Sequence, residues 1–403
     1  MLGVLRVLSR LERVAETLRA ALNALATQNP EWVQQRVPRD WYERYGRRIE
    51  EYRLPRGQAA RAAYARQVGA DGAWLLAHVA APDTPQALQQ LPAVTVLHTC
   101  WQQEYAPGAD GLPEWRDPKA CPAASERLES PYEPEARFAT KRQLQWVGYK
   151  VHLTETCDEE APHLVTQVTT TIAPATDVAQ LAGIQDALAA QNRLPSEHLV
   201  DAAYVRALNL VQSRERYQID LVGPVDTDHR WQARVEGGFT TECFAIDWEA
   251  HEAICPRGQH SLRWCETYTA RKRSMIHIDF DPPHCLPCPD RARCTRAKSG
   301  GGARALTLQP RAENEALVAG RARQQTEEFA QRYARRAGIE GTFSQGVRAL
   351  GMRQARYHGL RKTHLQHVAT ATALNLRRLQ DWHDGTPRAA TRCSRFARLA
   401  PAS

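Results

Sequence analysis

The stretch QWVGYKVHLTET, residues 145–156, decides the fold class of this chain. Its residues alternate in character, with Tyr149, Val151 and Leu153 on one side of an extended chain and polar residues between them on the other. A period of two over this length is typical of a strand that buries one face. The stretch therefore predicts a half-buried β-strand.

The elements that follow this strand alternate between strand and helix. After a turn at 157–162 the sequence predicts a strand over 164–172, a helix over 176–191 with Thr176 or Asp177 as N-cap, a strand over 198–200 that ends at Asp201, a helix over 202–215 and a strand over 217–224. The order strand, strand, helix, strand, helix, strand predicts an α/β core.

The rest of the chain differs from this core in composition. Before it, Leu11, Val14, Leu18, Leu22 and Leu25 recur at three and four residues and predict an amphipathic helix that begins near Val4. After it, short β-like runs alternate with Pro, Gly and Cys, and long charged helices are predicted over 311–336 and 363–382. The predicted organisation is a helical segment at 1–104, an exposed connection at 105–144, a first core part at 145–225, a β-rich cysteine-containing insertion at 226–310, a second core part at 311–384 and a disordered basic tail at 385–403.

Composition narrows the class of protein. The chain has 403 residues, a formal net charge of +8 and a sequence pI of about 9.0. An excess of arginine is compatible with a polyanionic partner without requiring one. No apolar run is long enough to span a membrane, and the first residues lack a secretory pattern, so a cytoplasmic location is expected.

Two acidic residues stand out as candidate site residues. Asp201 lies where α/β sheets place ligand-binding groups, at the carboxyl end of a buried strand, although an N-cap for the next helix is an alternative interpretation. Glu340 follows Tyr333 and Arg336 at seven and four residues, so the three side chains would share one face of a helix. A solvated face with an Arg–Glu pair is the alternative there.

The spacing Tyr333, Arg336, Glu340 resembles the signature of bacterial insertion-sequence transposases with a DDE active site. In that signature a Lys is expected seven residues after the Glu, whereas this chain has Val347 there and Arg348 next to it. The resemblance extends over residues 5–382, through RLERVAETLRAALNALA, YGRRIEEYRLPRG, GYKVHLTETCDE, HLVDAAYV, CPRGQHS, CLPCPDRARCT, YARRAGIEGTFSQGVRALGMRQARYHGLRKTHLQHV and ATALNLRRL.

The resemblance implies an RNase H-like core in which Asp, Asp and Glu bind two Mg²⁺ or Mn²⁺ ions. Asp201 matches the second Asp and Glu340 the Glu. The first Asp of such proteins ends an opening strand directly before the helix predicted here from Val4, and nothing precedes Met1. The expectation is therefore an incomplete core, truncated at the N-terminus, without its opening strand, its first catalytic Asp and its usual N-terminal DNA-binding domain.

The function implied by the resemblance is cleavage and joining of DNA strands for a mobile element. With one carboxylate missing, the chain is expected to be inactive alone; the alternative is a non-catalytic DNA-binding remnant, the product of a pseudogene. Its implied partners are double-stranded DNA, both transposon ends and target, and a second copy of the chain on that DNA, in a bacterial cytoplasm at the nucleoid.

Basic residues crowd the sequence around Glu340. The resemblance implies that Tyr333 and Arg336 contact DNA phosphates near the cleaved bond. Arg348, Arg353, Arg356 and Lys362 follow as a candidate track for the DNA backbone, for which a solvated surface is the alternative. The neighbouring His358, His364 and His367 are interpreted as packing or phosphate contacts rather than metal ligands.

The cysteines of the predicted insertion have metal-ligand spacing. Cys285 and Cys288 form CxxC, Cys294 follows six residues later, and Cys255 lies upstream in CPRG. Four thiolates would close a tetrahedral structural zinc site. Reduced buried thiols and an iron–sulfur cluster are the alternatives.

Overall fold

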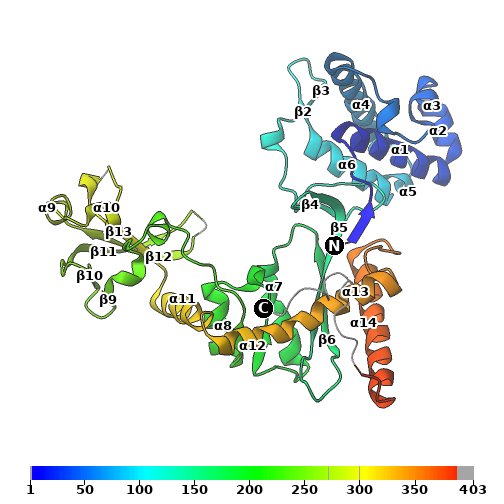
Figure 1. Ribbon diagram of the computed structural model, residues 1–403. Helices are drawn as coiled ribbons and strands as arrows, with labels where there is room; N and C mark the ends of the chain where they lie inside the picture. The colour runs from blue at the N-terminus through cyan, green and yellow to red at the C-terminus, as the bar shows by residue number, and fades with distance from the viewer. Residues whose placement is uncertain (1, 271, 299, 388–403) are drawn as a thin grey trace. The chain divides into compact units, whose positions relative to one another are not determined.

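The computed structural model describes residues 2–270, 272–298 and 300–387. They form a mixed α/β protein with several small sheets (Figure 1). The chain divides into two compact units. Unit 1 comprises residues 1–175 and 338–403, and unit 2 comprises residues 176–337. No helix in the described part of the chain is long and apolar enough to cross a membrane. The predicted tail at 385–403 falls, from residue 388 on, outside the described residues.

Unit 1 is built from two separate parts of the chain. Its helices are α1 (Arg10–Gln28), α2 (Pro30–Arg36), α3 (Asp40–Tyr45), η1 (Glu51–Arg53), α4 (Gln58–Val79), α5 (Gln86–Gln89), α6 (Pro92–Glu104), η2 (Pro118–Ala120), α13 (Gly338–Leu350) and α14 (Leu360–His383). Its strands are β1 (Leu2–Leu5), β2 (Tyr105–Pro107), β3 (Pro113–Trp115), β4 (Arg137–Lys141), β5 (Leu144–Glu155) and β6 (Val165–Ile172).

Unit 2 is one continuous segment. Its helices are α7 (Asp177–Ala190), η3 (Ala202–Tyr204), α8 (Ala207–Tyr217), η4 (Trp231–Arg234), η5 (Thr241–Cys243), α9 (Pro282–Cys285), α10 (Arg291–Cys294), η6 (Gly300–Gly302), α11 (Arg311–Arg323), α12 (Glu327–Ala334) and η7 (Arg335–Ala337). Its strands are β7 (Glu197–Leu199), β8 (Asp220–Val222), β9 (Ala245–Asp247), β10 (Glu252–Ile254), β11 (Ser261–Tyr268), β12 (Ser274–Phe280) and β13 (Ala305–Leu308).

Helix α1 begins later than the sequence predicts. Ser9 is its N-cap: the Ser9 hydroxyl accepts a hydrogen bond from the Glu12 N–H, and the Glu12 carboxylate accepts one from the Ser9 N–H. This reciprocal pair fixes the first turn. Residues 2–5 instead form strand β1, which pairs antiparallel with β5. The predictions of a helix from Val4 and of no opening strand are therefore wrong for the described residues, since pairing with β5 satisfies this backbone as a strand.

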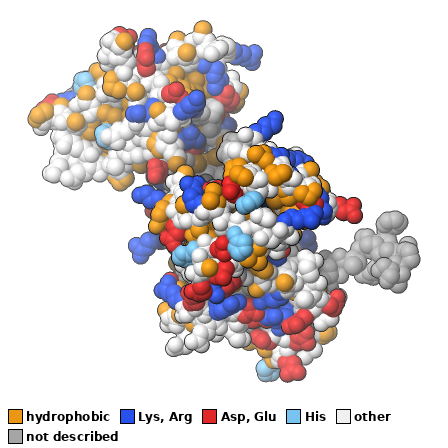
Figure 2. Space-filling view, turned by 90° about the vertical axis from the view of Figure 1, so that its left-hand side faces the viewer, with side chains coloured by type: hydrophobic (Ala, Val, Ile, Leu, Met, Phe, Trp, Pro, Cys, Tyr) orange, Lys and Arg blue, Asp and Glu red, His pale blue; other side chains and the backbone are white. Residues whose placement is uncertain are grey.

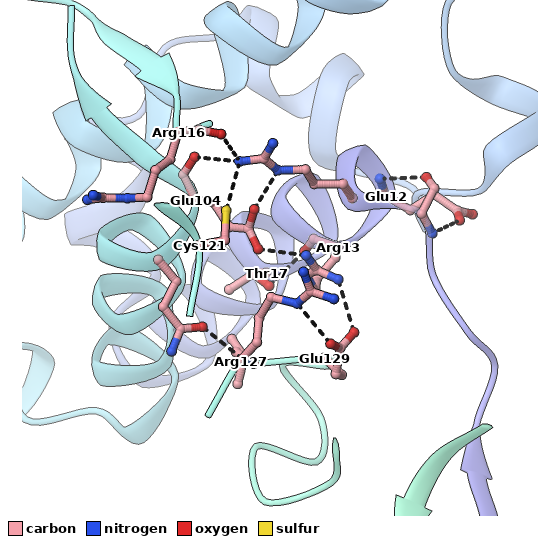
Figure 3. Close-up of polar contacts among 12 residues, drawn as sticks. Glu12, Arg13, Thr17, Glu104, Arg116, Cys121, Arg127 and Glu129 are labelled. Atoms are coloured by element: carbon pink, nitrogen blue, oxygen red, sulfur yellow. Dashed lines mark hydrogen bonds and ion pairs between the residues drawn. The ribbon is translucent and has the colours of Figure 1, made fainter. Parts of the chain in front are cut away.

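The predicted apolar face of α1 is confirmed, because Leu11, Val14, Leu18 and Leu25 are buried in the core of the helical segment. Charged residues of the same helix are buried beside this face. The Arg13 guanidinium donates to Glu104 at 2.6 Å and to Glu129 at 3.0 Å, and all three side chains are less than 5% exposed (Figure 3). Burial opposes the charge of Arg13, but the two carboxylates raise its pKa above the ordinary value. Glu129 belongs to the predicted exposed connection, so part of that connection is buried.

The sheet of unit 1 joins β1, β5 and β4, with β6 also paired to β5, and all pairs are antiparallel. Tyr149 on β5 is fully buried, as its place in the alternating pattern predicts. His152, on the face predicted to be polar, is only 6% exposed. Helix α14 packs on β6, where the Asn375 side chain exchanges two hydrogen bonds with the backbone of Val165. Strand β5 is therefore covered on both faces along part of its length.

The α/β part of unit 2 contains the parallel strands β7 and β8. Helices α7, α8 and α11 cover them around a core that includes Leu181, Val200, Leu210 and Leu221. Thr176 is the N-cap of α7, as one of the two predicted alternatives. The predicted order of strands and helices is present from β5 to β8, but these strands pair as two sheets, one in each unit. An RNase H-like arrangement of all of them stays a prediction.

Strands β9 to β13 occupy the predicted β-rich region and pair as a two-stranded and a three-stranded antiparallel sheet (Figure 1). The long helix predicted over 311–336 is divided into α11 and α12. Thr326 ends this continuity, because its hydroxyl accepts a hydrogen bond from the Phe329 N–H and caps a new helix. The threonine cap is a local sequence signal for a helix start. The prediction of one long helix missed it because the residues on both sides have a helical pattern.

We predict that Glu104→Ala destabilises unit 1 by about 3–5 kcal/mol, because it leaves the buried Arg13 guanidinium with one carboxylate instead of two. Thermal unfolding followed by circular dichroism measures the loss, with Glu126→Ala, at an exposed glutamate nearby, as the control. Equal melting temperatures for the two variants would show that the buried pair contributes nothing.

Candidate active site

Asp201 lies at the carboxyl end of a parallel strand pair. Its neighbour Val200 donates a backbone hydrogen bond to Val222 at 2.8 Å, which extends the pairing of β7 and β8. Asp201 then caps η3 by accepting from the Ala202 N–H at 2.8 Å. Its side chain is 54% exposed. The cap interpretation is therefore confirmed only for this 3-10 turn, because the helix predicted over 202–215 begins at Ala207 with Arg206 as its N-cap. The exposed carboxylate also lies where α/β sheets bind ligands.

Arg336 and Tyr333 approach Asp201 within unit 2. The Arg336 guanidinium lies 3.7 Å from the Asp201 carboxylate, and it also lies 5.9 Å from the centre of the Tyr333 ring. Tyr333 in turn stacks on Phe329 with the ring planes 8° apart. A carboxylate, a guanidinium and a phenol thus meet at the end of β7. The sequence predicted these residues for one site, and the structure places these three together.

An ion-pair network holds α12 in this position. Arg332 donates to Glu197 on β7 at 2.5 Å and to Asp220 on β8 at 2.7 Å, and Arg323 donates to Asp220 at 2.6 Å. Partial burial would raise the pKa of Asp220, but the hydrogen bonds from the two arginines hold it below its ordinary value. The sequence analysis missed this network, since the pairs are 103 to 135 residues apart and have no local pattern.

Glu340 lies in the first turn of α13 and is exposed. The 3-10 turn η7 separates α13 from α12, so Tyr333, Arg336 and Glu340 do not share one continuous α-helix as predicted. The boundary between the two units falls at the same turn, with Glu340 in unit 1 and Asp201 in unit 2. The approach of Glu340 to Asp201 stays a prediction.

A buried polar cluster fixes α13 in unit 1. The Glu155 carboxylate at the end of β5 accepts hydrogen bonds from the Thr342 hydroxyl at 2.5 Å and from Arg378 on α14 at 2.9 Å. Arg378 also donates to Thr342 and, at 2.6 Å, to the His163 carbonyl. Arg378 therefore joins two helices to a strand. Two signals were present, the Glu of HLTET and the Thr two residues after Glu340, but neither has a pattern that predicts their pairing.

The basic segment after Glu340 is ordered and exposed. Arg348, Arg353, Arg356 and Lys362 are all exposed, and no carboxylate of a described residue lies within ion-pair distance of any of them. The loop that carries two of them is held by Gln366, which accepts from the Arg356 N–H and donates to the Gln354 carbonyl, both at 2.8 Å.

Other surface cations among the described residues are of both kinds. Arg61, Arg66 and Arg377 each lie within 3.0 Å of a carboxylate, whereas the exposed Arg47 and Arg48 have no ion pair with a described residue. Figure 2 shows Lys and Arg side chains interspersed with Asp and Glu over the face in view, without one large area of a single sign. The net charge of the chain therefore does not locate a nucleic-acid surface, whereas the segment from Arg348 to Lys362 combines exposure with a local excess of positive charge.

The three histidines in and after this segment have structural partners. His367 is fully buried, and its Nδ1 lies 2.7 Å from the Thr170 hydroxyl on β6, which His364 also approaches at 3.2 Å. Burial lowers the pKa of His367 to about 4, so the ring packs in its neutral form. His358 lies 3.0 Å from the buried Glu133. The interpretation of these histidines as packing residues is confirmed for His367.

The four predicted zinc ligands line one pocket. It is lined by Cys255, Cys285, Cys288 and Cys294 together with Phe239, Phe244, Phe280, Arg291 and Arg304. Burial raises the pKa of the Cys294 thiol to about 11, and the three other cysteines add to the shift. Within the described ranges, no group of three or more His, Cys, Asp or Glu side chains is arranged so that it could hold a metal ion, so the four thiols line one pocket without forming a metal-binding geometry.

Comparison with known proteins gives one match. Residues 254–380 match a family model described as a transposase DDE domain. The match supports a DDE-type transposase. It includes Glu340, the basic segment and all four pocket cysteines, whereas Asp201 lies outside it. No curated protein and no solved structure shows significant similarity to the chain.

We predict that Thr342→Val loosens α13, because it removes the hydroxyl that joins Glu155 to Arg378 in a buried position. The loss of a buried hydrogen bond to a charged group costs about 1.5–3 kcal/mol. Hydrogen exchange measured by mass spectrometry should become faster over residues 338–350. Thr372→Val is the matched control, since Thr372 is exposed and bonds only within α14. Unchanged exchange in the Thr342 variant would contradict the role given to this cluster.

Proposed function

We propose that this chain contains catalytic residues of a DNA transposase that performs metal-dependent strand cleavage and strand transfer. The match of residues 254–380 to a transposase DDE domain is the observation that supports this function best, because it includes Glu340. Asp201 is assigned as a second carboxylate of the site on independent grounds, its position at the end of β7 and its contact with Arg336.

The donor chemistry of the two carboxylates suits Mg²⁺ or Mn²⁺. Both side chains are exposed, and hard divalent cations prefer carboxylate oxygens. When bound, such ions activate the attacking oxygen and stabilise the leaving oxygen of a phosphodiester. Asp201 and Glu340 would hold them, Asp201 through the carboxylate oxygen that does not cap η3.

Arg336 and Tyr333 are assigned to binding of the DNA phosphate beside the site. A guanidinium binds phosphate oxygens through paired hydrogen bonds, and its proximity to Asp201 keeps positive charge close to the bond that would react. Stacking of Tyr333 on Phe329 restricts the phenol to one orientation. Both groups would therefore orient a DNA strand rather than transfer protons.

Arg348, Arg353, Arg356 and Lys362 are assigned to the DNA backbone away from the reacting bond. Their exposure and their lack of described acidic partners leave the full charge available to phosphates. We further propose that the strands from β5 to β8 belong to an RNase H-like core, as their order supports. Two copies of the chain are expected to act together on two DNA ends.

We predict that replacing these four cations by alanine weakens DNA binding. Each phosphate contact releases counterions, so the slope of log K against log salt should become shallower by about 3 to 4. Fluorescence anisotropy with duplex DNA at several salt concentrations measures it.

The control removes the same charge from paired cations of unit 1 by changing Arg36, Arg61, Arg66 and Arg377 to alanine. A control variant that loses as much of the salt slope as the test variant would assign binding to net charge alone and reject the track.

We also predict that Asp201 and Glu340 bind metal together. Mn²⁺ binding to the chain with DNA, followed by electron paramagnetic resonance, should weaken in Asp201→Asn and in Glu340→Gln. The double variant should lose little more than either single variant, because two ligands of one site are not additive. Asp186→Asn, at an exposed, ion-paired aspartate of the same unit as Asp201, is the control.

A nicking assay tests whether Asp201 and Glu340 support cleavage in this chain, and Mn²⁺ binding distinguishes the two candidate functions. Two family carboxylates are assigned where the resemblance implies three, so we expect DNA binding without cleavage, since a missing metal ligand slows phosphoryl transfer by orders of magnitude. Cleavage that disappears in Asp201→Ala would show that a further acid of the chain completes the site. Independent, additive effects of the two carboxylates on Mn²⁺ binding would instead favour a non-catalytic DNA-binding protein.

A further inference from the structure

We propose that the pocket of Cys255, Cys285, Cys288 and Cys294 is a structural zinc site that holds together the strands and turns of residues 226–310. This site is separate from the proposed metal site for DNA cleavage and does not depend on that function. Four thiolates around Zn²⁺ form a closed tetrahedral centre with a net charge of −2. The observations that support it are the position of the sulfurs, the turns that carry them and the charge of the pocket.

The turn at Cys255 has the hydrogen bonding of a thiolate ligand. The Arg257 N–H points at the Cys255 sulfur, 3.4 Å away, and the Gly258 N–H donates to the Cys255 carbonyl at 2.8 Å. Gly258 adopts φ of +74°, which lets the chain turn back so that Gln259 accepts from the Cys255 N–H. A backbone N–H directed at sulfur stabilises the negative charge that a metal-bound thiolate carries.

A second connection brings the two cysteine segments together. Asp290, which lies between Cys288 and Cys294, forms an ion pair with Arg257 of the Cys255 turn and another with Arg293 at 3.2 Å. Asp290 is largely buried, with 11% of its side chain exposed. The two segments are thus fixed against each other by contacts outside the cysteines. The four thiols are not arranged to hold an ion among the described residues, so zinc binding would require their side chains and turns to rearrange.

The charge of the pocket favours an anionic centre. Arg304 is 7% exposed, and it and Arg291 both line the pocket. Their Nε atoms are buried without an acceptor among the described residues, and no described carboxylate lies within ion-pair distance of either guanidinium. A buried cation without a counter-charge is costly. Among the other lining residues Arg257 is paired with Asp290 and Asp281 adds a carboxylate, so Arg291 and Arg304 offset part of the net charge of a zinc ion with four thiolates.

The small size of the local core gives such a centre a structural role. The buried apolar residues around strands β9 to β13 are Phe244, Ala253, Ile276, Ile278, Phe280, Leu306 and Leu308. Cores of this size commonly require a disulfide or a metal for stability. No disulfide joins the described cysteines. Zinc would link the end of β10 to α9 and α10 and so close this core on one side.

The test measures the metal content of the full chain, purified without chelators, by mass spectrometry. We expect one zinc ion per chain in the wild type, and loss of that zinc in Cys255→Ser and in Cys288→Ser. Cys243→Ser and Cys265→Ser, at cysteines of the same region outside the pocket, should keep it. A wild-type chain without zinc, zinc kept by both pocket variants, or iron with sulfide in its place would overturn the proposal.

Two further measurements remain informative if the serine variants fail to fold. Cobalt exchanged into the wild-type chain should give the thiolate charge-transfer band and the intense visible bands of a tetrahedral site, and weak octahedral bands would reject it. Arg304→Met keeps all four cysteines but removes one buried cation, so a competing chelator should extract zinc about tenfold more readily. Arg234→Met, at an exposed arginine of the same region, is the control, and equal extraction from both variants would reject the charge argument.

Discussion

The contact of Glu155 with Arg378 is the constraint on which unit 1 depends, because the unit is made of two pieces of chain. The two residues are 223 positions apart, and their hydrogen bond joins the end of β5 to α14. Two other contacts cross the same gap: Asn375 bonds the backbone of Val165, and the buried Glu133 accepts the Gly359 N–H at the start of α14. A carboxylate at a helix N-terminus is favourable for the helix dipole. Polar side chains therefore hold the two pieces of chain together. They also specify one alignment of the two pieces, because a buried charge without its partner is costly.

Contact with a carboxylate distinguishes the arginines that stabilise the fold from those that can bind DNA. Arg13, Arg332 and Arg378 each contact a carboxylate and are more than 70% buried, so their charge is already compensated. The exposed cations between Arg348 and Lys362 have no such partner among the described residues. They begin in the last turn of α13, the helix that Thr342 and Glu155 fix in place, and extend to the first turn of α14. Because α13 is held in place, the basic residues that follow Glu340 have a defined position relative to it. This arrangement suits binding to successive phosphates of a DNA strand.

Sequence reasoning succeeded where local periodicity decides the structure. The apolar face of α1, the N-cap of α7 and the span of α14 follow from spacing within one helix, and strands β5 and β6 follow from alternation. It failed where the partner is distant. Residues 2–5 have a helical pattern with the residues after them, yet pairing with β5 makes them a strand. Thr326 and the turn after Ala334 interrupt a charged run whose composition is helical throughout.

The candidate site shows the same division between what spacing determines and what it does not. Asp201 was identifiable because strand ends are recognisable in sequence, and its approach to Arg336 follows from a motif. The supporting residues Glu197, Asp220 and Glu155 could not be identified from the sequence. A carboxylate in a strand that pairs with an arginine more than a hundred residues away has the same local sequence pattern as one on the surface. The four cysteines lie between these cases. Their spacing indicates a metal site. The reason to expect a negatively charged one is the buried Arg304 together with the partly buried Arg291, and only the folded chain shows that both line the same pocket.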